Sequence, residues 1–368
     1  MNFPLSYKKI LERIDAVAPQ KYAGTRNFID GAVTHLSPYI SRGVISTKQV
    51  YDAVVAKGFE PKKIEKFIQE LAWRDYWQQI WIAKGDAINN DLIKKQPTAA
   101  QKGLANSITE NNTGIEAVDK GIADLYQTGY MHNHVRMYVA AIACNVGKSH
   151  WHIPAQWLYY NLLDGDWASN ALSWQWVCGA NSHRIYYANQ DNINRYCHTK
   201  QEGTFLDMSY DKFKDLPIPK VLEKIVKPKF ITPLPSTKEP TIDLKKPTLI
   251  YNFYNVDPQW RSDVDANRIL LLEPSIFEKY PVSEKVLNFC ISLAKENIKG
   301  IQIYAAEFAE LNKLAKKEIY YKEHPLNKYK GNEDPRDWLT SVNGYFPSFF
   351  AFYKKARKEL IIAEEKAE

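Results

Sequence analysis

The pattern of apolar residues changes along this 368-residue chain, and that change limits the possible folds most. Up to about residue 205, apolar residues recur at helical spacing, as in IEKFIQELAWRDYWQQIW (64–81), and no segment alternates with the period of two that predicts a strand. The stretch 213–246 is rich in Pro and Lys, which is typical of an extended linker. Beyond it, short β-branched and aromatic runs alternate with helical segments, as in a parallel α/β sheet.

These patterns predict a mainly α protein with three parts: a helical domain over 1–212, the linker 213–246, and a small α/β domain over 247–368. The last part is expected to close with a helix and a charged tail. The expected strands lie within 247–257, 268–274, 300–306 and 317–323.

Composition excludes several classes of protein. A hydrophobic content of 45% with 25% charged residues is that of an ordinary folded protein, and a net charge of +7 permits a polyanionic partner without requiring one. No apolar run approaches the ~18 residues of a membrane span, and the N-terminus lacks a signal peptide. The four cysteines form no C-x-x-C pair, which argues against a zinc or iron–sulfur site and a disulfide framework. We expect a soluble cytoplasmic protein without a bound metal.

The stretch LLDGDWASNALSWQW (162–176) places Asp164, Asp166 and Asn170 on neighbouring turns of an apolar segment. Because buried polar groups need partners, this clustering predicts a polar ligand. A second stretch, TGYMHNHVRM (128–137), sets Arg136 inside another apolar helix. A buried arginine requires a carboxylate, and Asp164 is the obvious candidate.

Two further stretches are less specific by themselves. THLSPYISRG (34–43) opens a helix with Ser37 and Pro38, whose backbone N–H groups suit an anion but also serve as an ordinary helix cap. ELAWRDYW (70–77) places Glu70 and Arg74 one turn apart, where an ion pair on a core helix is an equally good interpretation.

Taken in order, these four stretches resemble the flavin-binding domain of the DNA photolyase/cryptochrome family over about residues 20–180. The resemblance implies a U-folded FAD held by the helical domain. Val33 stands where the family usually has Thr or Ser. The residues implied to contact FAD are Tyr22, Val33, Thr34, His35, Leu36, Ser37, Phe67, Arg74, Tyr130, Asn133, Arg136, Asp164, Asp166 and Asn170.

The resemblance also implies roles for individual residues. Val33 to Ser37 would cradle the FAD phosphates, with Arg74 and Tyr22 assisting. The Arg136–Asp164 pair would lie against the isoalloxazine ring, with Asp166 also at the flavin. Asn170 would face flavin N5, where an amide resembles photolyases and favours the anionic reduced flavin.

Two more sets of residues follow from the resemblance. The catalytic pocket for a damaged base would be lined by Glu70, Trp73, Asn133, Met137 and Trp176, and Asn133 favours a cyclobutane dimer over a six-four lesion. Trp174 and Trp151 would be the two inner electron-transfer tryptophans. The family's outer tryptophan has no counterpart, so a surface tyrosine or Trp157 substitutes for it, or photoreduction is weak.

After Trp176 the resemblance fails, and YYANQDNIN (186–194) matches no family segment. Three functions stay open: light-driven repair of cyclobutane dimers in UV-damaged DNA, a cryptochrome-like photoreceptor without repair, and an FAD-binding protein that has lost the chemistry. Joint retention of the five pocket residues favours repair. We expect a monomer that binds FAD and, if repair is active, UV-damaged DNA.

The order of the domains is unusual for this family, which normally begins with an α/β antenna domain. Here IYNFYNVDPQWRSDVD (250–265) resembles the first strand and loop of that domain, and GYFPSFFAFYKKARKEL (344–360) its closing helix. This predicts a permuted arrangement with a Rossmann-like sheet of four or five parallel strands over 247–350 and little room for a pigment. An unrelated α/β appendage is the alternative.

Overall fold

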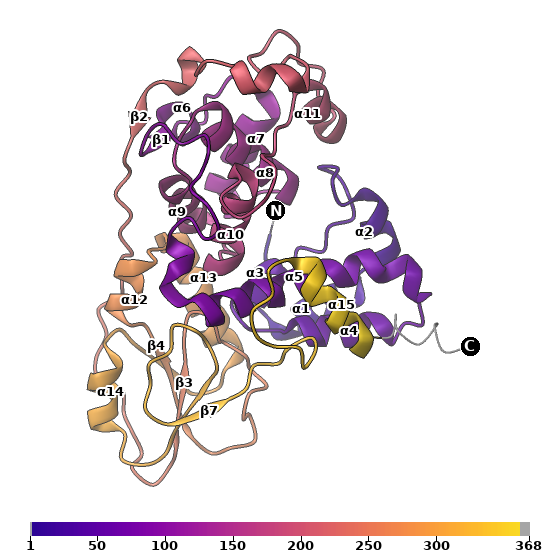
Figure 1. The fold of residues 1–368 in the computed structure, drawn as a ribbon. Coiled ribbons are helices and arrows are strands. Elements are labelled where there is room, and N and C mark those ends of the chain that lie inside the picture. Colours follow the sequence, from indigo (N-terminus) through magenta and orange to yellow (C-terminus); the bar gives the residue numbers. More distant parts are fainter. Residues whose placement is uncertain (1, 361–368) are drawn as a thin grey trace. The chain divides into compact units, whose positions relative to one another are not determined.

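The structure, a computed structural model, describes residues 2–360 and divides into two compact units (Figure 1). The first, which we call the sheet unit, contains the residues up to Gln20, Thr34–Ala83 and the chain from Ile231 onward. The second, the helical unit, contains Lys21–Val33 and Lys84–Phe230. The charged tail beyond residue 360 lies outside the described residues.

Helices dominate the helical unit, as the sequence predicts. Helix α10 packs against both α8 and α9, and α7 packs against α8. The elements of this unit are η1 Gly85–Asn89, β1 Leu104–Ala105, α6 Asn106–Thr109, α7 Glu116–Thr128, α8 Asn133–Ala141, η2 Ile142–Val146, α9 His152–Asn161, α10 Trp167–Cys178, α11 Gln190–Cys197, η3 Tyr210–Asp215, η4 Lys220–Leu222 and β2 Ile225–Val226. Helix α2, Pro19–Thr25, begins just before the unit.

Two details of the helical unit differ from the expectation. The apolar helix after Asn133 changes at Ile142–Val146 into a short π-helix whose five residues are all buried. A two-residue strand, β1, pairs antiparallel with β2, although no strand was expected before residue 205. Two residues are too short to show a period-two pattern, so no sequence signal marks this strand.

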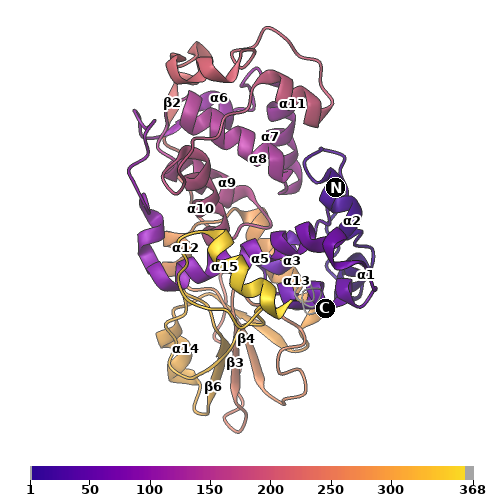
Figure 2. The same cartoon turned by 45° about the vertical axis from the view of Figure 1, so that its right-hand side comes forward.

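A group of helices belongs to the sheet unit, and α5 is the longest of them. Its apolar residues are buried at helical spacing from Ile64 to Leu71, and every residue from Asp75 to Trp81 is buried. Figures 1 and 2 both show α15 alongside α5. The group consists of α1 Tyr7–Asp15, α3 Ser37–Ser41, α4 Thr47–Val55, α5 Pro61–Lys84, α15 Phe349–Ala356 and η5 Arg357–Glu359.

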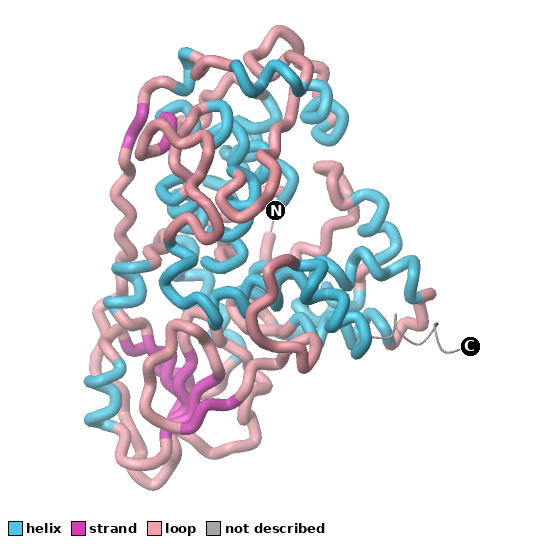
Figure 3. The backbone as a smooth tube through the Cα atoms, viewed as in Figure 1, coloured by secondary structure: helices cyan, strands magenta, loops and turns pink. Residues whose placement is uncertain are grey.

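The same unit contains a sheet of five parallel strands in the order β5-β4-β3-β6-β7 (Figure 3). This confirms the predicted parallel sheet. Strand β3 lies in the centre and all four of its residues are buried, as expected of a parallel strand covered on both faces. The elements are β3 Thr248–Tyr251, β4 Asn267–Leu271, α12 Pro274–Lys279, α13 Glu284–Asn297, β5 Ile301–Tyr304, α14 Phe308–Leu314, β6 Ile319–Lys322 and β7 Asn332–Asp334.

The end of α3 packs closely on the loop that follows β3. Arg42 is fully buried, and its guanidinium carbon lies 3.5 Å from the centre of the Phe253 ring. Gly43 has a φ of +64°, and a Cβ there would approach the Tyr254 carbonyl oxygen to 2.4 Å. Residues 34–83 and the sheet therefore form one compact unit. The domain limits at 212 and 246 stay a prediction.

Within residues 2–360, no helix has the length and hydrophobicity needed to cross a membrane.

Asp75 ties helix α5 to two other parts of the sheet unit. One carboxylate oxygen accepts the Leu339 N–H at 2.7 Å, and the other accepts the Thr47 hydroxyl at 2.9 Å. The side chain is buried, and burial raises the pKa of this carboxyl group to about 6, although both hydrogen bonds oppose the shift.

This raised pKa predicts how stability depends on pH. Because the ordinary value is 3.8, the folded protein binds more protons than the unfolded chain between about pH 4 and pH 6. The contribution of protonated Asp75 to the free energy of unfolding is largest below the pKa of the unfolded chain. It falls by up to about 3 kcal/mol as the pH rises through about 6. Asp75→Asn should flatten this part of the profile in urea unfolding measured at several pH values. Asp52→Asn, at an exposed position of α4, is the control. Identical profiles for Asp75→Asn and the unchanged protein would contradict the assignment.

Candidate functional site

The turn between α9 and α10 contains a buried ion pair. Asp164, whose side chain is only 3% exposed, accepts a hydrogen bond from Arg136 Nη2 at 2.9 Å. Arg136 Nε also donates to the Met131 carbonyl oxygen at 2.8 Å, which fixes the plane of the guanidinium group. The ion pair predicted from the two apolar stretches is therefore present, and it links α8 to the start of α10.

The next residues of the turn are held by backbone contacts. Asp166 caps α10 by accepting the Ser169 N–H at 2.7 Å, as an acidic N-cap does. Asn170, one turn into the helix, donates its side-chain amide to the Ala155 carbonyl oxygen at 2.8 Å. This bond orients the Asn170 side chain. The NH₂ group points toward Ala155, and the side-chain carbonyl oxygen does not take part in the bond.

Of the other predicted flavin residues of the helical unit, Tyr130 lies against the ion pair. Tyr130 is buried, its ring lies 5.4 Å from the Arg136 guanidinium carbon, and burial raises the pKa of its hydroxyl to about 12. Asn133 is exposed at the first residue of α8. Tyr22 and Val33 are partly buried.

The sheet unit holds most of the predicted phosphate-binding residues, namely Thr34 to Ser37 and Arg74, whereas Val33 and Tyr22 lie in the helical unit. His35 has a φ of +52°, and the Leu36 N–H donates to Thr34 Oγ1 at 3.3 Å, so a tight turn precedes Ser37 at the start of α3. Arg74 on α5 donates to Ser41 Oγ at 3.0 Å, which places its positive charge beside α3. This arrangement provides hydroxyls and one cation.

Two α5 residues, Glu70 and Trp73, were predicted for the damaged-base pocket and a third, Phe67, for contact with FAD, and the structure shows their neighbours. Phe67 is buried in the core. Glu70 makes an ion pair with Lys66 at 3.1 Å. Trp73 is partly buried and stacks on Phe349 of α15, with ring centroids 3.8 Å apart and planes 9° from parallel. One face of Trp73 is thus covered by a residue that sequence reasoning placed in the α/β domain.

The end of α10 presents an exposed aromatic ring. Trp176 is 40% exposed, and the centroid of the Tyr186 ring lies 6.3 Å from that of its indole. Tyr186 begins the YYANQDNIN stretch, which continues into α11 with Asn189 as its N-cap. This stretch, without a family match, therefore lines the surroundings of Trp176. Met137, also predicted for the pocket, is partly buried on α8, which packs against α10.

Three exposed cations flank the same helix end, and we call Lys94, Lys95 and Arg184 the basic rim. The Lys94 N–H donates to the Ala180 carbonyl oxygen at 3.2 Å. The Ser182 hydroxyl lies within hydrogen-bond distance of the Trp176 and Arg184 carbonyl oxygens, at 2.8 and 2.5 Å. These contacts hold the loops that carry Lys94 and Arg184 at the end of α10. Sequence reasoning missed the rim, because it is formed by two separate loops.

The predicted electron-transfer residues Trp174 and Trp151 are both buried. Trp157 is also buried, and its indole N–H donates at 2.9 Å to the hydroxyl of Tyr126, a residue exposed at the surface. This pair offers a ring that could replace the missing outer tryptophan. Asp91, which accepts the Trp151 indole N–H, was not singled out from the sequence.

A small cavity lies at the carboxyl end of the parallel sheet. It has a volume of about 20 Å³, room for about one water molecule. Tyr254 stacks on His324 at its wall, with ring centroids 4.2 Å apart, and Tyr329 donates to Glu273 at 2.9 Å. Side chains of the sheet unit fill this end of the sheet, so the cavity does not accommodate a ring system.

Comparisons with known proteins show what part of the chain is similar to. Residues 67–229 match the family model described as the FAD binding domain of DNA photolyase. A deoxyribodipyrimidine photo-lyase of Alkalihalophilus pseudofirmus is 27% identical over 171 residues, covering 45% of this chain and 36% of that protein. A cryptochrome DASH of Danio rerio is 30% identical over 175 residues, covering 45% and 33%. A solved cryptochrome of Synechocystis sp. PCC6803 has a TM-score of 0.49 at 25% identity, covering 61% and 49%.

Residues 67–229 are thus similar to the FAD binding domain of DNA photolyase, and the cofactor of such a domain is FAD. The chain spans about a third of the length of the curated relatives it matches. The residues of the helical unit fit the cofactor, because this unit offers a buried guanidinium–carboxylate pair and an oriented amide.

Replacement of Arg136 tests the importance of the ion pair for the fold and for flavin binding. Arg136→Ala leaves the Asp164 charge buried without its cation, which costs several kcal/mol of folding free energy or of flavin affinity. We expect loss of FAD absorbance after gel filtration, or a lower melting temperature. Arg195→Ala removes an exposed arginine of α11 and should change neither. Full FAD occupancy in a well-folded Arg136→Ala protein would count against the assignment.

Proposed function

We propose that the protein repairs cyclobutane pyrimidine dimers in UV-damaged DNA, using blue light and reduced FAD. The observation that carries this proposal is the exposed indole of Trp176 beside the basic rim. A flat apolar lesion turned out of a strand stacks on such a ring, and Lys and Arg side chains beside it suit the neighbouring phosphates. Relatives named deoxyribodipyrimidine photo-lyase support the same activity.

The side chains of this protein would divide the work. FAD, when bound and reduced, supplies the electron that splits the dimer. Arg136 and Asp164 would hold the ring system, and Asn170 would face N5 with an amide that cannot act as an acid. Glu70 and Asn133 would hydrogen-bond the pyrimidine carbonyl groups, with Trp73, Met137 and Trp176 as the apolar walls. Thr34, Ser37 and Arg74 would bind the phosphates.

The order of the sheet supports the proposed relation to an antenna domain. Numbered along the chain, the strands lie in the order 3-2-1-4-5, which is that of the first five strands of the doubly wound dinucleotide-binding fold. A permuted, Rossmann-like domain is therefore favoured over an unrelated appendage. Its cavity of about 20 Å³ argues that the flavin of this protein absorbs light without a second pigment in the sheet.

A photoreceptor without repair activity is the second candidate. The stacking of Phe349 on Trp73 favours it, because Phe349 covers a face of the indole on which a base would otherwise stack. A relative named cryptochrome DASH is as similar as the photo-lyases.

A single assay tests the proposal. The purified protein is loaded with FAD, the flavin is reduced, and dimer loss from UV-irradiated oligothymidine is followed under blue light and in the dark. Repair predicts loss in the light only. No dimer loss with fully reduced flavin would leave the photoreceptor as the better interpretation.

Stacking on Trp176 predicts a specific loss of binding. Trp176→Ala should weaken the binding of a dimer-containing single strand by about 1–3 kcal/mol while FAD stays bound, because a base loses its aromatic platform. Fluorescence anisotropy with damaged and intact oligonucleotides measures this difference. Tyr210→Ala removes another exposed ring of the helical unit and should have no effect. Equal loss in both variants would contradict the role of Trp176.

The basic rim predicts the salt dependence of binding. A Lys94→Ala/Lys95→Ala/Arg184→Ala variant should bind damaged and intact strands more weakly in the same proportion. The slope of log K against log salt should fall by about 0.7 for each phosphate that the variant no longer neutralises. An unchanged slope would show that these cations do not meet the DNA backbone. Lys120→Ala and Lys212→Ala, at exposed positions elsewhere in the helical unit, provide the control.

A further inference from the structure

Trp151 differs from two neighbouring buried tryptophans in the group that accepts its indole proton. Its Nε1–H donates at 2.7 Å to a carboxylate oxygen, Asp91 Oδ1. The indole N–H of Trp157 donates to a hydroxyl at 2.9 Å, and that of Trp167 donates to the amide oxygen of Asn89 at 2.7 Å. A buried indole needs an acceptor, and neutral groups satisfy it at those two positions. At Trp151 the acceptor can also take the proton.

Gln96 fixes the position of Asp91 relative to Trp151. Its backbone N–H donates to Asp91 Oδ2 at 2.9 Å, and its side-chain oxygen accepts the Trp151 backbone N–H at 2.9 Å. The other end of its amide donates to the Ser149 carbonyl oxygen at 2.9 Å. Gln96 is buried, so the separation between the carboxylate and the indole does not depend on a mobile side chain.

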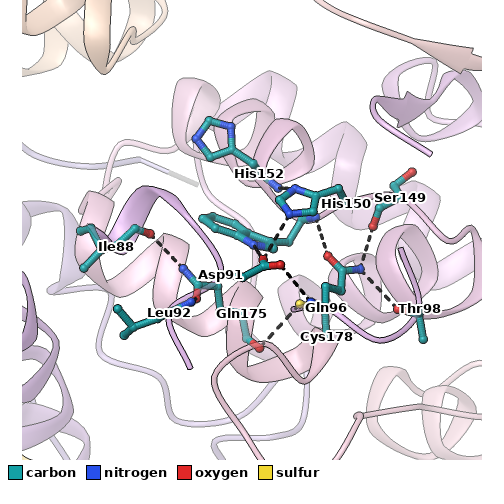
Figure 4. Close-up of polar contacts among 11 residues, drawn as sticks. Ile88, Asp91, Leu92, Gln96, Thr98, Ser149, His150, His152, Gln175 and Cys178 are labelled. Atoms are coloured by element: carbon teal, nitrogen blue, oxygen red, sulfur yellow. Dashed lines mark hydrogen bonds and ion pairs between the residues drawn. The ribbon is translucent and has the colours of Figure 1, made fainter. Parts of the chain in front are cut away.

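His150 completes the set of donors around Asp91 (Figure 4). Its Nδ1 accepts the His152 N–H at 3.4 Å, so in the neutral ring Nε2 carries the hydrogen and donates to Asp91 Oδ1 at 3.2 Å. Asp91 therefore receives three N–H groups, as an ionised carboxylate does. The His150 side chain is 31% exposed, which brings solvent near the cluster.

We propose that Asp91 is the proton acceptor of Trp151 during photoreduction of the flavin. The inference rests on the proposed role of Trp151 as an electron relay. Trp151 would give up one electron through Trp174, and bound FAD in its oxidised, light-excited form would be the acceptor. The Nε1–H bond of the oxidised indole then breaks, its proton forms an O–H bond on Asp91 Oδ1, and the indole is left as a neutral radical. A thiol in solution later returns one electron, and the proton moves back to Nε1.

This transfer has a physical benefit at a buried site. Oxidation alone would leave a positive indole inside the protein, and the electron would return to it readily. After proton transfer both the indole and the carboxyl group are neutral, so the electron cannot return without a proton. The lifetime of the reduced flavin is thereby extended, which matters in a chain that lacks the outer tryptophan of its family.

The other titratable groups that face Asp91 are His150 and Cys178, and His152 lies beside His150. Burial lowers the pKa of His152, with His150 adding to the shift. Burial raises the pKa of Cys178 to about 12, with Asp91 adding to the shift, so its thiol keeps its proton at neutral pH. Asp91 is the group of this cluster that accepts the hydrogen bond of the indole N–H, so it can receive that proton.

Asp91→Asn tests the proposal, because the amide keeps the shape and one hydrogen-bonding oxygen but is not a base. Flash excitation of the FAD-loaded, oxidised protein is followed by transient absorption, which distinguishes the cationic from the neutral tryptophan radical. In the unchanged protein the cation should convert to the neutral radical, more slowly in D₂O than in H₂O. In Asp91→Asn the neutral radical should be lost and less reduced flavin should accumulate. Asp86→Asn, at an exposed residue of η1, should match the unchanged protein.

A second readout does not depend on light. The indole N–H resonance of Trp151, assigned by its loss in Trp151→Phe, should move upfield in Asp91→Asn protein kept in the dark. An unmoved resonance would show that the hydrogen bond to the carboxylate is absent and would overturn the proposal. If Asp91→Asn does not fold, the D₂O comparison on the unchanged protein decides, and a decay without isotope effect overturns it.

The outcomes separate this inference from the proposed function. Photoreduction that is lost in Trp174→Phe and Trp151→Phe but unchanged in Asp91→Asn overturns the role of Asp91 alone. Photoreduction that is unchanged in both Phe variants overturns the electron relay and this inference with it. Dimer repair by chemically reduced protein is independent of either result, because that electron does not come through Trp151.

Discussion

The buried ion pair between Arg136 and Asp164 is the interaction on which the candidate flavin site depends. Two charges taken out of water are tolerated only if each finds the other and their remaining polar atoms are satisfied. Arg136 meets the carboxylate at 2.9 Å and a backbone carbonyl at 2.8 Å. The need to satisfy this pair fixes where α8 lies against the turn before α10, and the same turn orients Asp166 and Asn170.

Carboxylates that are buried or partly buried serve the same purpose elsewhere in the molecule. Asp75 joins α5 to segments 28 and 264 residues away in the chain, and Asp91 joins Trp151 to a loop 60 residues earlier. Each carboxylate receives donors from several elements, so removal of one leaves more than one donor without a partner. Such groups specify which loops meet in the core. They are also the groups whose protons can move when a neighbour changes its charge.

The sequence predicted those parts of the molecule that depend on local pattern. Helix α5 follows from the spacing of Ile64, Phe67 and Leu71, and strands β3 to β6 follow from short β-branched runs. Strand β7 was missed because Asn332–Asp334 is polar and partly exposed at the edge of the sheet. The Arg136–Asp164 pair was predicted because a buried arginine has to find a carboxylate. Asp91 and the basic rim were not, because their partners are distant in sequence and no local pattern marks them.

The close packing of α3 on the sheet explains why the expected domain limits and the compact units differ. The pattern of apolar and β-branched residues along the sequence separates helical from α/β segments. The fold, however, follows the contacts that bury most surface. Arg42 is fully buried over Phe253, and Val256 donates its N–H to the Arg42 carbonyl oxygen at 2.9 Å. Gly43 allows this approach, since any side chain there would meet the Tyr254 carbonyl. Segments from both expected domains thus share one core, and the order in which a chain visits its elements does not have to match the order in which they pack.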